Sequence, residues 1–126
     1  MAKGFSLTMY PWLYLAKFSD RKWSGKYIEQ PHKSPEEEAS MNDEAASKLQ
    51  TERNYIPGLP LVNYTTQYGM GCFEGLKAFP QPDGSLKIFR PDENGKRFKM
   101  SMEGLYMPGF PVDMFVESVM TVPRKN

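Results

Sequence analysis

The 126-residue sequence predicts an α+β fold in which helices pack against an antiparallel sheet. An aromatic-rich N-terminal segment is interrupted by one short polar turn, which is typical of a β-hairpin. Further along, a stretch of alternating residues is followed by an Asp83-Gly84 turn and a short apolar run. Apolar residues then recur at helical spacing. The expected strands lie within residues 12–28, 72–79 and 86–89, and the expected helices lie near residues 92–106 and 113–122.

The first two strands are expected to form the N-terminal hairpin. Trp12–Phe18 is rich in aromatic residues, Ser19–Lys22 is a polar turn, and Trp23–Ile28 is a plausible return strand.

A polar segment follows over residues 29–57. Ser34 is a favourable helix N-cap, Pro35 suits the first helical position, and Glu37 lies three residues after Ser34, as a capping box requires. Residues 36–50 contain few apolar side chains, so we expect a surface helix in a solvated insertion.

Residues 63–79 are expected to lead from a short helical turn, which ends at Gly69, into a strand. Because side chains alternate across a strand, this one should have two different faces. One face is expected to carry Phe73, Gly75, Lys77 and Phe79, and the other Cys72, Glu74, Leu76 and Ala78. Pro80 and Pro82 are expected outside the ladder because proline has no N–H to donate, so the hairpin loop should exceed two residues.

Asp92 is the expected N-cap of a helix that extends to about Tyr106. Its buried stripe is expected to consist of Phe98, Met102 and Leu105. Gly95 and Gly104 weaken such a helix by about 1 kcal/mol each relative to alanine, so tertiary packing must stabilise it.

A last helix is expected after Asp113, its candidate N-cap. Pro123 is expected to break that helix, because proline removes an N–H and its ring clashes with the preceding turn.

Composition excludes several classes of function. A formal net charge of +1 indicates neither a nucleic-acid nor an anionic-membrane partner. No apolar run is long enough to cross a bilayer, and no signal peptide is expected. The single cysteine, Cys72, excludes an intrachain disulfide and favours a cytoplasmic location. His32 is the only histidine, so no metal site is expected.

Two groups of residues could bind ligands. Arg97 lies about one turn into a helix, where its planar guanidinium could bind a phosphate, although a solvated surface arginine is also common. Tyr68, Phe73 and Gly75 could form an apolar pocket beside a closely approached backbone, or an ordinary β core. A dinucleotide-binding motif at Gly69–Gly75 is excluded, because its third glycine is one residue too far and it precedes a strand.

Two runs carry a resemblance to a known family. They are Tyr68–Phe79, with the sequence YGMGCFEGLKAF, and Phe89–Arg97, with the sequence FRPDENGKR. Together they resemble the small domain of branched-chain amino acid aminotransferases, which are fold-type IV pyridoxal-phosphate enzymes. The resemblance is strong over residues 59–111, plausible from Trp12, and weak over residues 29–57.

The resemblance implies roles for the candidate residues. Arg97 would contact the phosphate of pyridoxal 5′-phosphate, and Tyr68, Phe73 and Gly75 would line the pocket for the branched side chain of the substrate. Tyr68 would also reach toward the site of a partner subunit in a homodimer. The reaction would transfer an amino group between leucine, isoleucine or valine and 2-oxoglutarate.

The resemblance also implies that these 126 residues form a single small domain without the large cofactor-binding domain. The lysine that forms a Schiff base with the cofactor would lie in that large domain. We therefore expect no catalytic residue in this chain and no activity from the chain alone. A second hypothesis remains open: a non-catalytic interaction or dimerisation module that keeps the aminotransferase small-domain fold.

Overall fold

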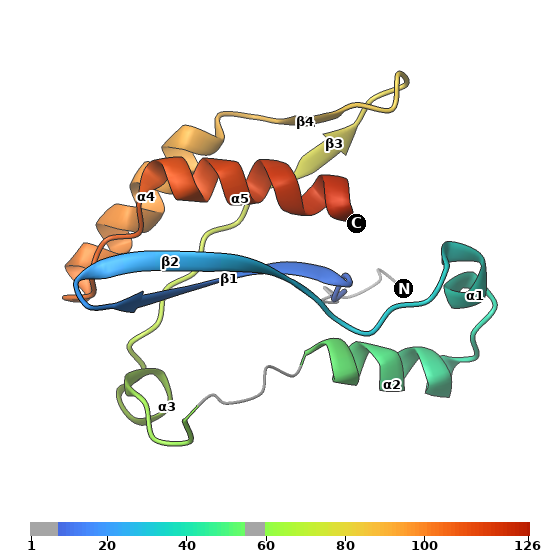
Figure 1. Ribbon diagram of the computed structural model, residues 1–126, viewed down its shortest axis with the longest axis horizontal. Coiled ribbons are helices and arrows are strands. Elements are labelled where there is room, and N and C mark those ends of the chain that lie inside the picture. The colour runs from blue at the N-terminus through green and yellow to red at the C-terminus, as the bar shows by residue number, and fades with distance from the viewer. Residues whose placement is uncertain (1–7, 55–59) are drawn as a thin grey trace, which may run out of the picture.

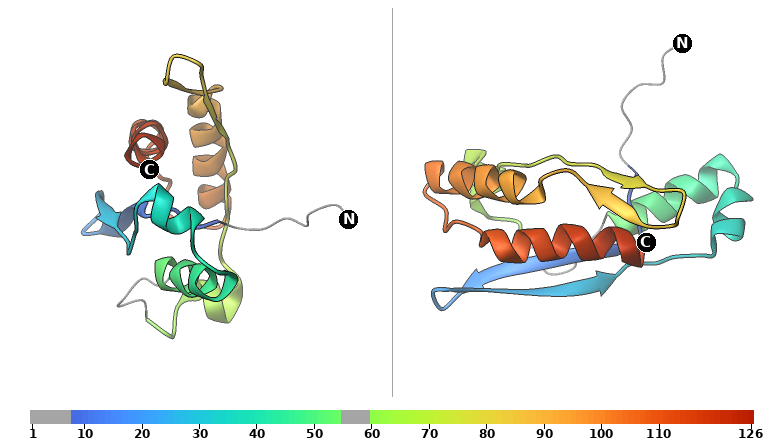
Figure 2. Two further views of the ribbon diagram at one scale, coloured as in Figure 1. Left: turned by 90° about the vertical axis from the view of Figure 1, so that its right-hand side faces the viewer. Right: turned by 90° about the horizontal axis from the view of Figure 1, so that it is seen from above.

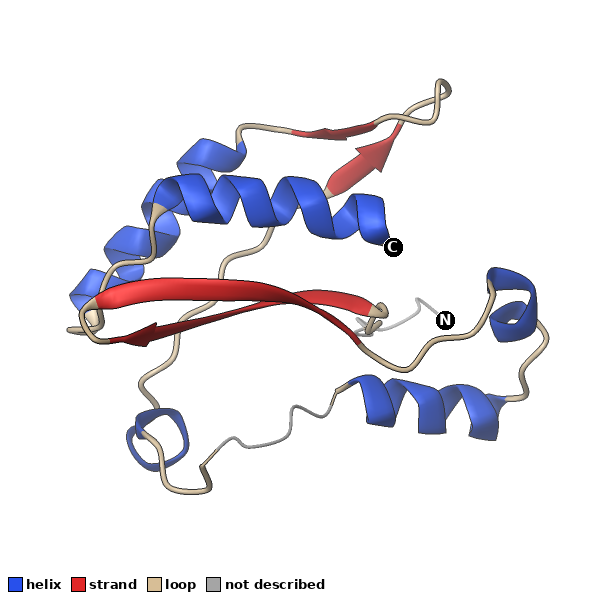
Figure 3. Ribbon diagram, in the orientation of Figure 1, coloured by secondary structure: helices blue, strands red, loops and turns tan. Residues whose placement is uncertain are grey.

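The computed structural model describes residues 8–54 and 60–126 and confirms the α+β class. Within these ranges, two antiparallel sheets of two strands each are accompanied by five helices (Figures 1 and 3). The elements are, in chain order, β1 (Trp12–Ser19), β2 (Lys22–Glu29), α1 (Pro35–Ala39), α2 (Asp43–Arg53), α3 (Tyr64–Tyr68), β3 (Ala78–Pro80), β4 (Leu86–Ile88), α4 (Pro91–Gly104) and α5 (Val112–Lys125). The β1–β2 hairpin lies between α4 and α5 on one side and α2 and α3 on the other, and α1 lies beyond its open end (Figures 1 and 2).

The predicted N-terminal hairpin is confirmed. Strands β1 and β2 pair from Trp12 opposite Glu29 to Ser19 opposite Lys22. The two residues between them, Asp20 and Arg21, have φ values of 50° and 62°. Positive φ at both central positions is the geometry of a type I′ turn, whose twist matches that of the flanking strands.

The single predicted sheet is wrong, because β3 and β4 pair only with each other. Residues 72–77 belong to no strand of the described structure. At Gly75 the N–H donates to Glu74 Oε1 (3.0 Å) and the carbonyl accepts from Asn94 Nδ2 (3.2 Å). These side-chain contacts satisfy the N–H and the carbonyl of Gly75 without a strand partner. The predicted alternation of faces is nevertheless confirmed: residues 72, 74, 76 and 78 are half-buried and residues 73, 75, 77 and 79 are exposed.

The β3–β4 loop contains the predicted Asp83-Gly84 turn, and Gly84 has a φ of 80°. Pro80, expected outside the ladder, instead ends β3 opposite Leu86. Gln81 N donates to Ser85 O (2.8 Å), so the adjacent Pro80–Leu86 pair is a non-hydrogen-bonded pair. The ladder therefore needs no N–H at Pro80.

Two predicted helix caps are wrong. Helix α4 begins at Pro91 with Arg90 as its N-cap, and Asp92 lies in the first turn, where its carboxylate pairs with Lys96. Helix α5 follows Pro111, so Asp113 also lies in a first turn.

Pro123 does not break α5, which continues to Lys125. Pro123 lies in the last turn of the helix, and only Arg124 and Lys125 follow it in α5. The side chain of Asn126 holds this turn, since its Nδ2 donates to Val122 O and to Trp12 O, both at 3.0 Å. Trp12 N donates in return to Asn126 Oδ1 (2.8 Å).

The core lies between the β1–β2 hairpin and helices α4 and α5. Its buried members are Met102, Phe110 and Phe115. Met102 and the half-buried Phe98 come from the predicted stripe of α4, whereas Leu105 is half-buried outside this cluster. A Cβ at Gly95 would lie 3.0 Å from the Phe115 ring, so glycine permits the close approach of α4 and α5.

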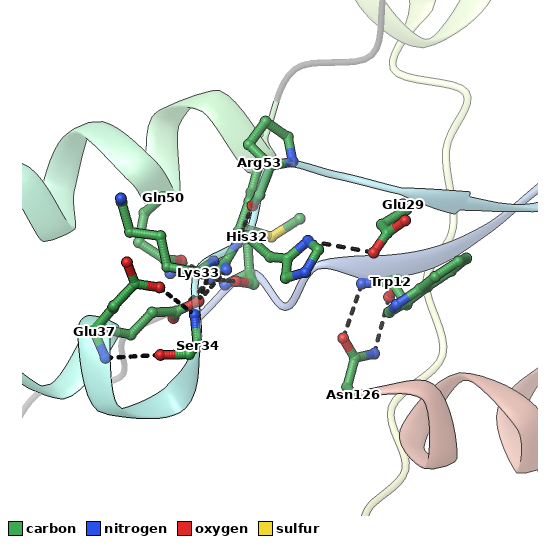
Figure 4. A network of polar contacts seen from close by, with 12 residues as sticks. Trp12, Glu29, His32, Lys33, Ser34, Glu37, Gln50, Arg53 and Asn126 are labelled. Carbon is green, nitrogen blue, oxygen red and sulfur yellow. Dashed lines mark hydrogen bonds and ion pairs between the residues drawn. The ribbon is translucent and has the colours of Figure 1, made fainter.

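The segment 29–57 is more than the solvated insertion that we expected. It forms α1, with the predicted Ser34–Glu37 capping box, and a separate helix, α2. Residues 55–57 of this segment lie outside the described residues. Arg53 of α2 is only 2% exposed and pairs with Glu38 (Figure 4).

Arg53 also holds the two chain segments at the open end of the hairpin, one before β1 and one after β2. Its Nε donates to Pro31 O (2.8 Å) and its Nη1 to Met9 O (3.2 Å). Gln50, one turn earlier on α2, accepts from Met9 N (2.6 Å) and donates to Met9 O (3.2 Å). These contacts fix α1 and α2 to the start of the hairpin.

We expect Arg53→Ala to lower the free energy of unfolding by about 3 kcal/mol, because it leaves Pro31 O without its donor, removes one of the two donors of Met9 O and removes the cation that pairs with Glu38. Urea unfolding measures the change. Lys48→Ala, at an exposed position on the same helix, is the matched control and should leave stability nearly unchanged. Equal unfolding midpoints for Arg53→Ala and the wild type would contradict this assignment.

Candidate functional site

A cluster of polar groups, which includes two of the predicted site residues, joins α4 to the segment that precedes β3. It consists of Glu74, Gly75, Asn94 and Arg97, which we call the Glu74 cluster. Asn94 and Arg97 are three residues apart on α4 and therefore lie on one face of the helix. Glu74 lies on the inward side of the alternating segment 72–79, which directs its carboxylate toward that helix.

Both carboxylate oxygens of Glu74 accept hydrogen bonds. Arg97 binds in bidentate fashion: Nε donates to Oε2 (2.7 Å) and Nη2 donates to Oε1. Asn94 Nδ2 and Gly75 N each donate to Oε1 at 3.0 Å. The carboxylate thus receives donors from α4 and from its own segment, which fixes its orientation.

The two charges of the cluster differ in exposure. The Glu74 side chain is 7% exposed and the Arg97 side chain 62%. The hydrogen bond from Arg97 is the main cause that lowers the pKa of Glu74 to about 2, against the opposing effect of burial. The same hydrogen bond raises the pKa of Arg97. The carboxylate is buried and satisfied, while part of the guanidinium remains open to solvent.

The structure brings two of the four predicted site residues together. Arg97 and Gly75 both contact the carboxylate of Glu74. Tyr68 and Phe73 are 77% and 95% exposed, so neither lines an enclosed pocket within the described residues. The space beside Gly75 is also open, since a Cβ there would meet no atom within 4 Å. A pocket at these residues would need walls from another part of the protein, and their roles stay predictions.

Known proteins are similar to about half of this chain. No family model matches the chain. A probable branched-chain-amino-acid aminotransferase of Streptomyces coelicolor is 53% identical over 67 residues, which cover 50% of this chain and 18% of that protein. A branched-chain-amino-acid aminotransferase of Haemophilus influenzae is 42% identical over 59 residues, or 47% of this chain and 17% of that protein. A methionine aminotransferase of Arabidopsis thaliana is 47% identical over 60 residues, or 48% of this chain and 17% of that protein.

About half of this chain is homologous to branched-chain amino acid aminotransferases. The resemblance that the sequence motifs predicted is therefore confirmed over that half. The chain spans less than a fifth of the length of these relatives.

The sequence analysis missed Glu74 and Asn94 as members of the site. One signal was available for Glu74: it is the only charged residue on the inward face of the segment 72–79. A carboxylate on an inward face requires a partner that satisfies its charge. Asn94 gave no comparable signal, since its role depends on where α4 packs.

An apolar groove of about 570 Å³ lies on the inward side of the segment 72–79, the side that also carries Glu74. It is lined by residues of both sheets and of α4 and α5, among them Tyr14, Leu76, Ala78 and Val119. None of the four predicted site residues lines it.

Two further observations concern metals and membranes. His32 Nδ1 lies 3.3 Å from a Glu29 carboxylate oxygen, and no group of three or more candidate metal ligands occurs in the described ranges. No helix in residues 8–54 and 60–126 is both long and apolar enough to cross a membrane.

The pKa of Glu74 predicts a pH dependence of stability. The pKa of Glu74 is about 2 in the folded chain and 4.5 ordinarily. The stabilisation of the fold by the ionised Glu74 carboxylate is therefore complete above about pH 4.5 and is lost as the pH falls toward 2. We expect Glu74→Gln to be less stable at pH 7 by about 2 kcal/mol, and the difference from the wild type to shrink between pH 4.5 and 2.

Urea unfolding at several pH values measures this difference. The other carboxylates titrate in both proteins, so their contributions cancel. Glu93→Gln is the control, because Glu93 is an exposed carboxylate of α4 that does not contact Arg97. A difference that stays constant from pH 7 to 2 would show that the charge of Glu74 contributes nothing.

Proposed function

We propose that this chain is part of a branched-chain amino acid aminotransferase, which transfers the amino group of leucine, isoleucine or valine to 2-oxoglutarate. The observation that carries the proposal is the identity of 42–53% to proteins named as such, over about half of the chain. One matched relative is named for methionine, so the shared segment is compatible with more than one aliphatic side chain.

The cofactor would be pyridoxal 5′-phosphate, and Arg97 is the residue that fits its phosphate. A guanidinium has five N–H donors, and Glu74 accepts only from the edge formed by Nε and Nη2. Nη1 makes no hydrogen bond within the described residues and belongs to a side chain that is 62% exposed. The cluster therefore fits one contact of a phosphate site.

The residues present indicate which parts of the active site this chain would contribute and which would come from the rest of the enzyme. Pyridoxal phosphate supplies an electron sink when it is bound. This chain would contribute a phosphate contact at Arg97 and apolar surface at Tyr68 and Phe73, beside the open backbone at Gly75. The Schiff-base lysine would come from another part of the enzyme, and the 126 residues alone would be inactive.

Two further parts of the proposal concern partners and location. A homodimer is supported by exposed apolar side chains such as Tyr68 and Phe73, which a second subunit could cover. A cytoplasmic location rests on the single cysteine. Three relatives have mitochondrial or chloroplastic in their names, so sequence similarity is compatible with more than one compartment.

We expect the purified 126-residue chain to show no transamination of leucine above the background of free cofactor. In a chimera, the chain's matched segment replaces the corresponding segment of the Streptomyces coelicolor relative, and we expect leucine transamination to be retained. Both are measured with leucine, 2-oxoglutarate and pyridoxal phosphate. A chimera that folds but is inactive would favour the non-catalytic interaction module.

Two substitutions in that chimera separate cofactor binding from substrate choice. Arg97→Ala should weaken cofactor retention by about 1.5–3 kcal/mol, because a charge-assisted contact to phosphate is lost. Phe73→Ala should leave retention unchanged and reduce the preference for leucine over alanine by about 1–3 kcal/mol. Cofactor dissociation and kcat/KM for leucine, valine and alanine measure both effects. Equal cofactor retention in Arg97→Ala and the unsubstituted chimera would remove Arg97 from the phosphate site.

A further inference from the structure

We propose that Glu74 and Asn94 are positioning residues, which hold the guanidinium of Arg97 so that its open edge can meet the phosphate of the cofactor. The inference rests on the proposed function and adds to it two residues that contact neither the cofactor nor the substrate.

The geometry of the guanidinium supports this role. Its plane is fixed by two parallel contacts, from Nε to Glu74 Oε2 and from Nη2 to Glu74 Oε1. A bidentate pair fixes the orientation of the fork as well as its position. The edge that contains Nη1 faces away from the carboxylate, because the donors of a guanidinium lie in one plane.

Glu74 can fix the guanidinium because it is itself fixed. Its side chain is 7% exposed, and Oε1 accepts also from Asn94 Nδ2 and Gly75 N, each at 3.0 Å. An exposed arginine ordinarily loses rotamer entropy when it binds an anion. An arginine that is already oriented avoids part of this cost and binds more tightly.

Asn94 joins the arginine to the predicted substrate site. Its Nδ2 donates to the Glu74 carboxylate and to Gly75 O (3.2 Å), while Gly75 N donates to the same carboxylate. Both backbone polar groups of Gly75 are therefore held by the cluster. The open side of Gly75 and the open edge of Arg97 are positioned by a single set of contacts.

The other ion pairs of α4 do not have this character. Lys96 pairs with Asp92 and Glu93, Arg90 pairs with Glu93, and Lys99 pairs with Glu103, each between residues three or four positions apart. Their side chains are 45–62% exposed. A purely structural pair would stabilise the fold without affecting phosphate binding, and this difference can be measured.

The experiment uses the ¹⁵N-labelled 126-residue chain and the side-chain resonances of Arg97, assigned with Arg97→Lys. The probes are pyridoxamine 5′-phosphate and pyridoxamine, which differ by the phosphate and have no aldehyde to react with surface lysines. In the wild type, we expect only the phosphate form to shift the Arg97 resonances. In Glu74→Gln and in Asn94→Ala, we expect its affinity to fall about threefold to fivefold, the range of a partly exposed ion pair, with faster exchange of the Arg97 Nε proton with water.

Three comparisons make the result decisive. Glu93→Gln, which removes an exposed carboxylate of α4, should leave the affinity unchanged. In an Arg97→Lys background, Glu74→Gln should have no further effect on the affinity. The Trp23 indole N–H donates to Gly109 O, and its resonance reports whether each variant is folded. If Glu74→Gln does not fold, Asn94→Ala still tests the proposal, because it keeps the Glu74–Arg97 ion pair.

Unchanged affinity for pyridoxamine 5′-phosphate in a folded Asn94→Ala or Glu74→Gln chain would overturn the proposal. A loss of affinity for pyridoxamine as large as that for pyridoxamine 5′-phosphate in these variants would also overturn it. Absence of any phosphate-dependent shift of Arg97 in the wild type would overturn it too. The chimera assay separates this failure from that of the proposed function, because an active chimera with these results keeps the aminotransferase assignment and removes only the positioning role.

Discussion

The contact between Trp23 and Phe110 joins the β1–β2 hairpin to the two C-terminal helices, and the position of the hairpin depends on it. The centroids of the Trp23 and Phe110 rings lie 4.9 Å apart in an edge-to-face arrangement, and Trp23 Nε1 donates to Gly109 O (3.0 Å). Both the apolar body and the polar tip of the indole are thus satisfied. Phe110 also packs on Phe98 of α4, so one aromatic cluster holds the sheet to the helical layer.

Because this core is small, buried charges help to fix the elements around it. Arg53 attaches α1 and α2 to the start of the hairpin, and Glu74 attaches the segment before β3 to α4. Each buried group is satisfied by several partners, which is the condition under which a buried charge is tolerated. The two pairs differ in which charge is buried: the cation in the first, and the carboxylate in the second.

This difference gives the second pair its functional interest. Glu74 is enclosed while Arg97 keeps an open edge, so the pair can serve a ligand as well as the fold. Phe73 and Gly75 lie on the outer face of the same segment, opposite Glu74. The proposed function assigns this exposed surface to a contact with another part of the enzyme.

The amino-acid sequence was enough to predict the features that depend on neighbouring residues: the Ser34 capping box, the turn at Gly84, and the alternation of faces over residues 72–79. It also pointed to the family and to Arg97, since motif and spacing are local properties. Only the tertiary structure decided that the strands form two separate sheets, that α5 continues through Pro123, and that Arg53 and Glu74 are buried. These outcomes depend on partners far away in the chain: Glu74 meets Arg97 across 23 residues, and no local pattern specifies how α4 packs.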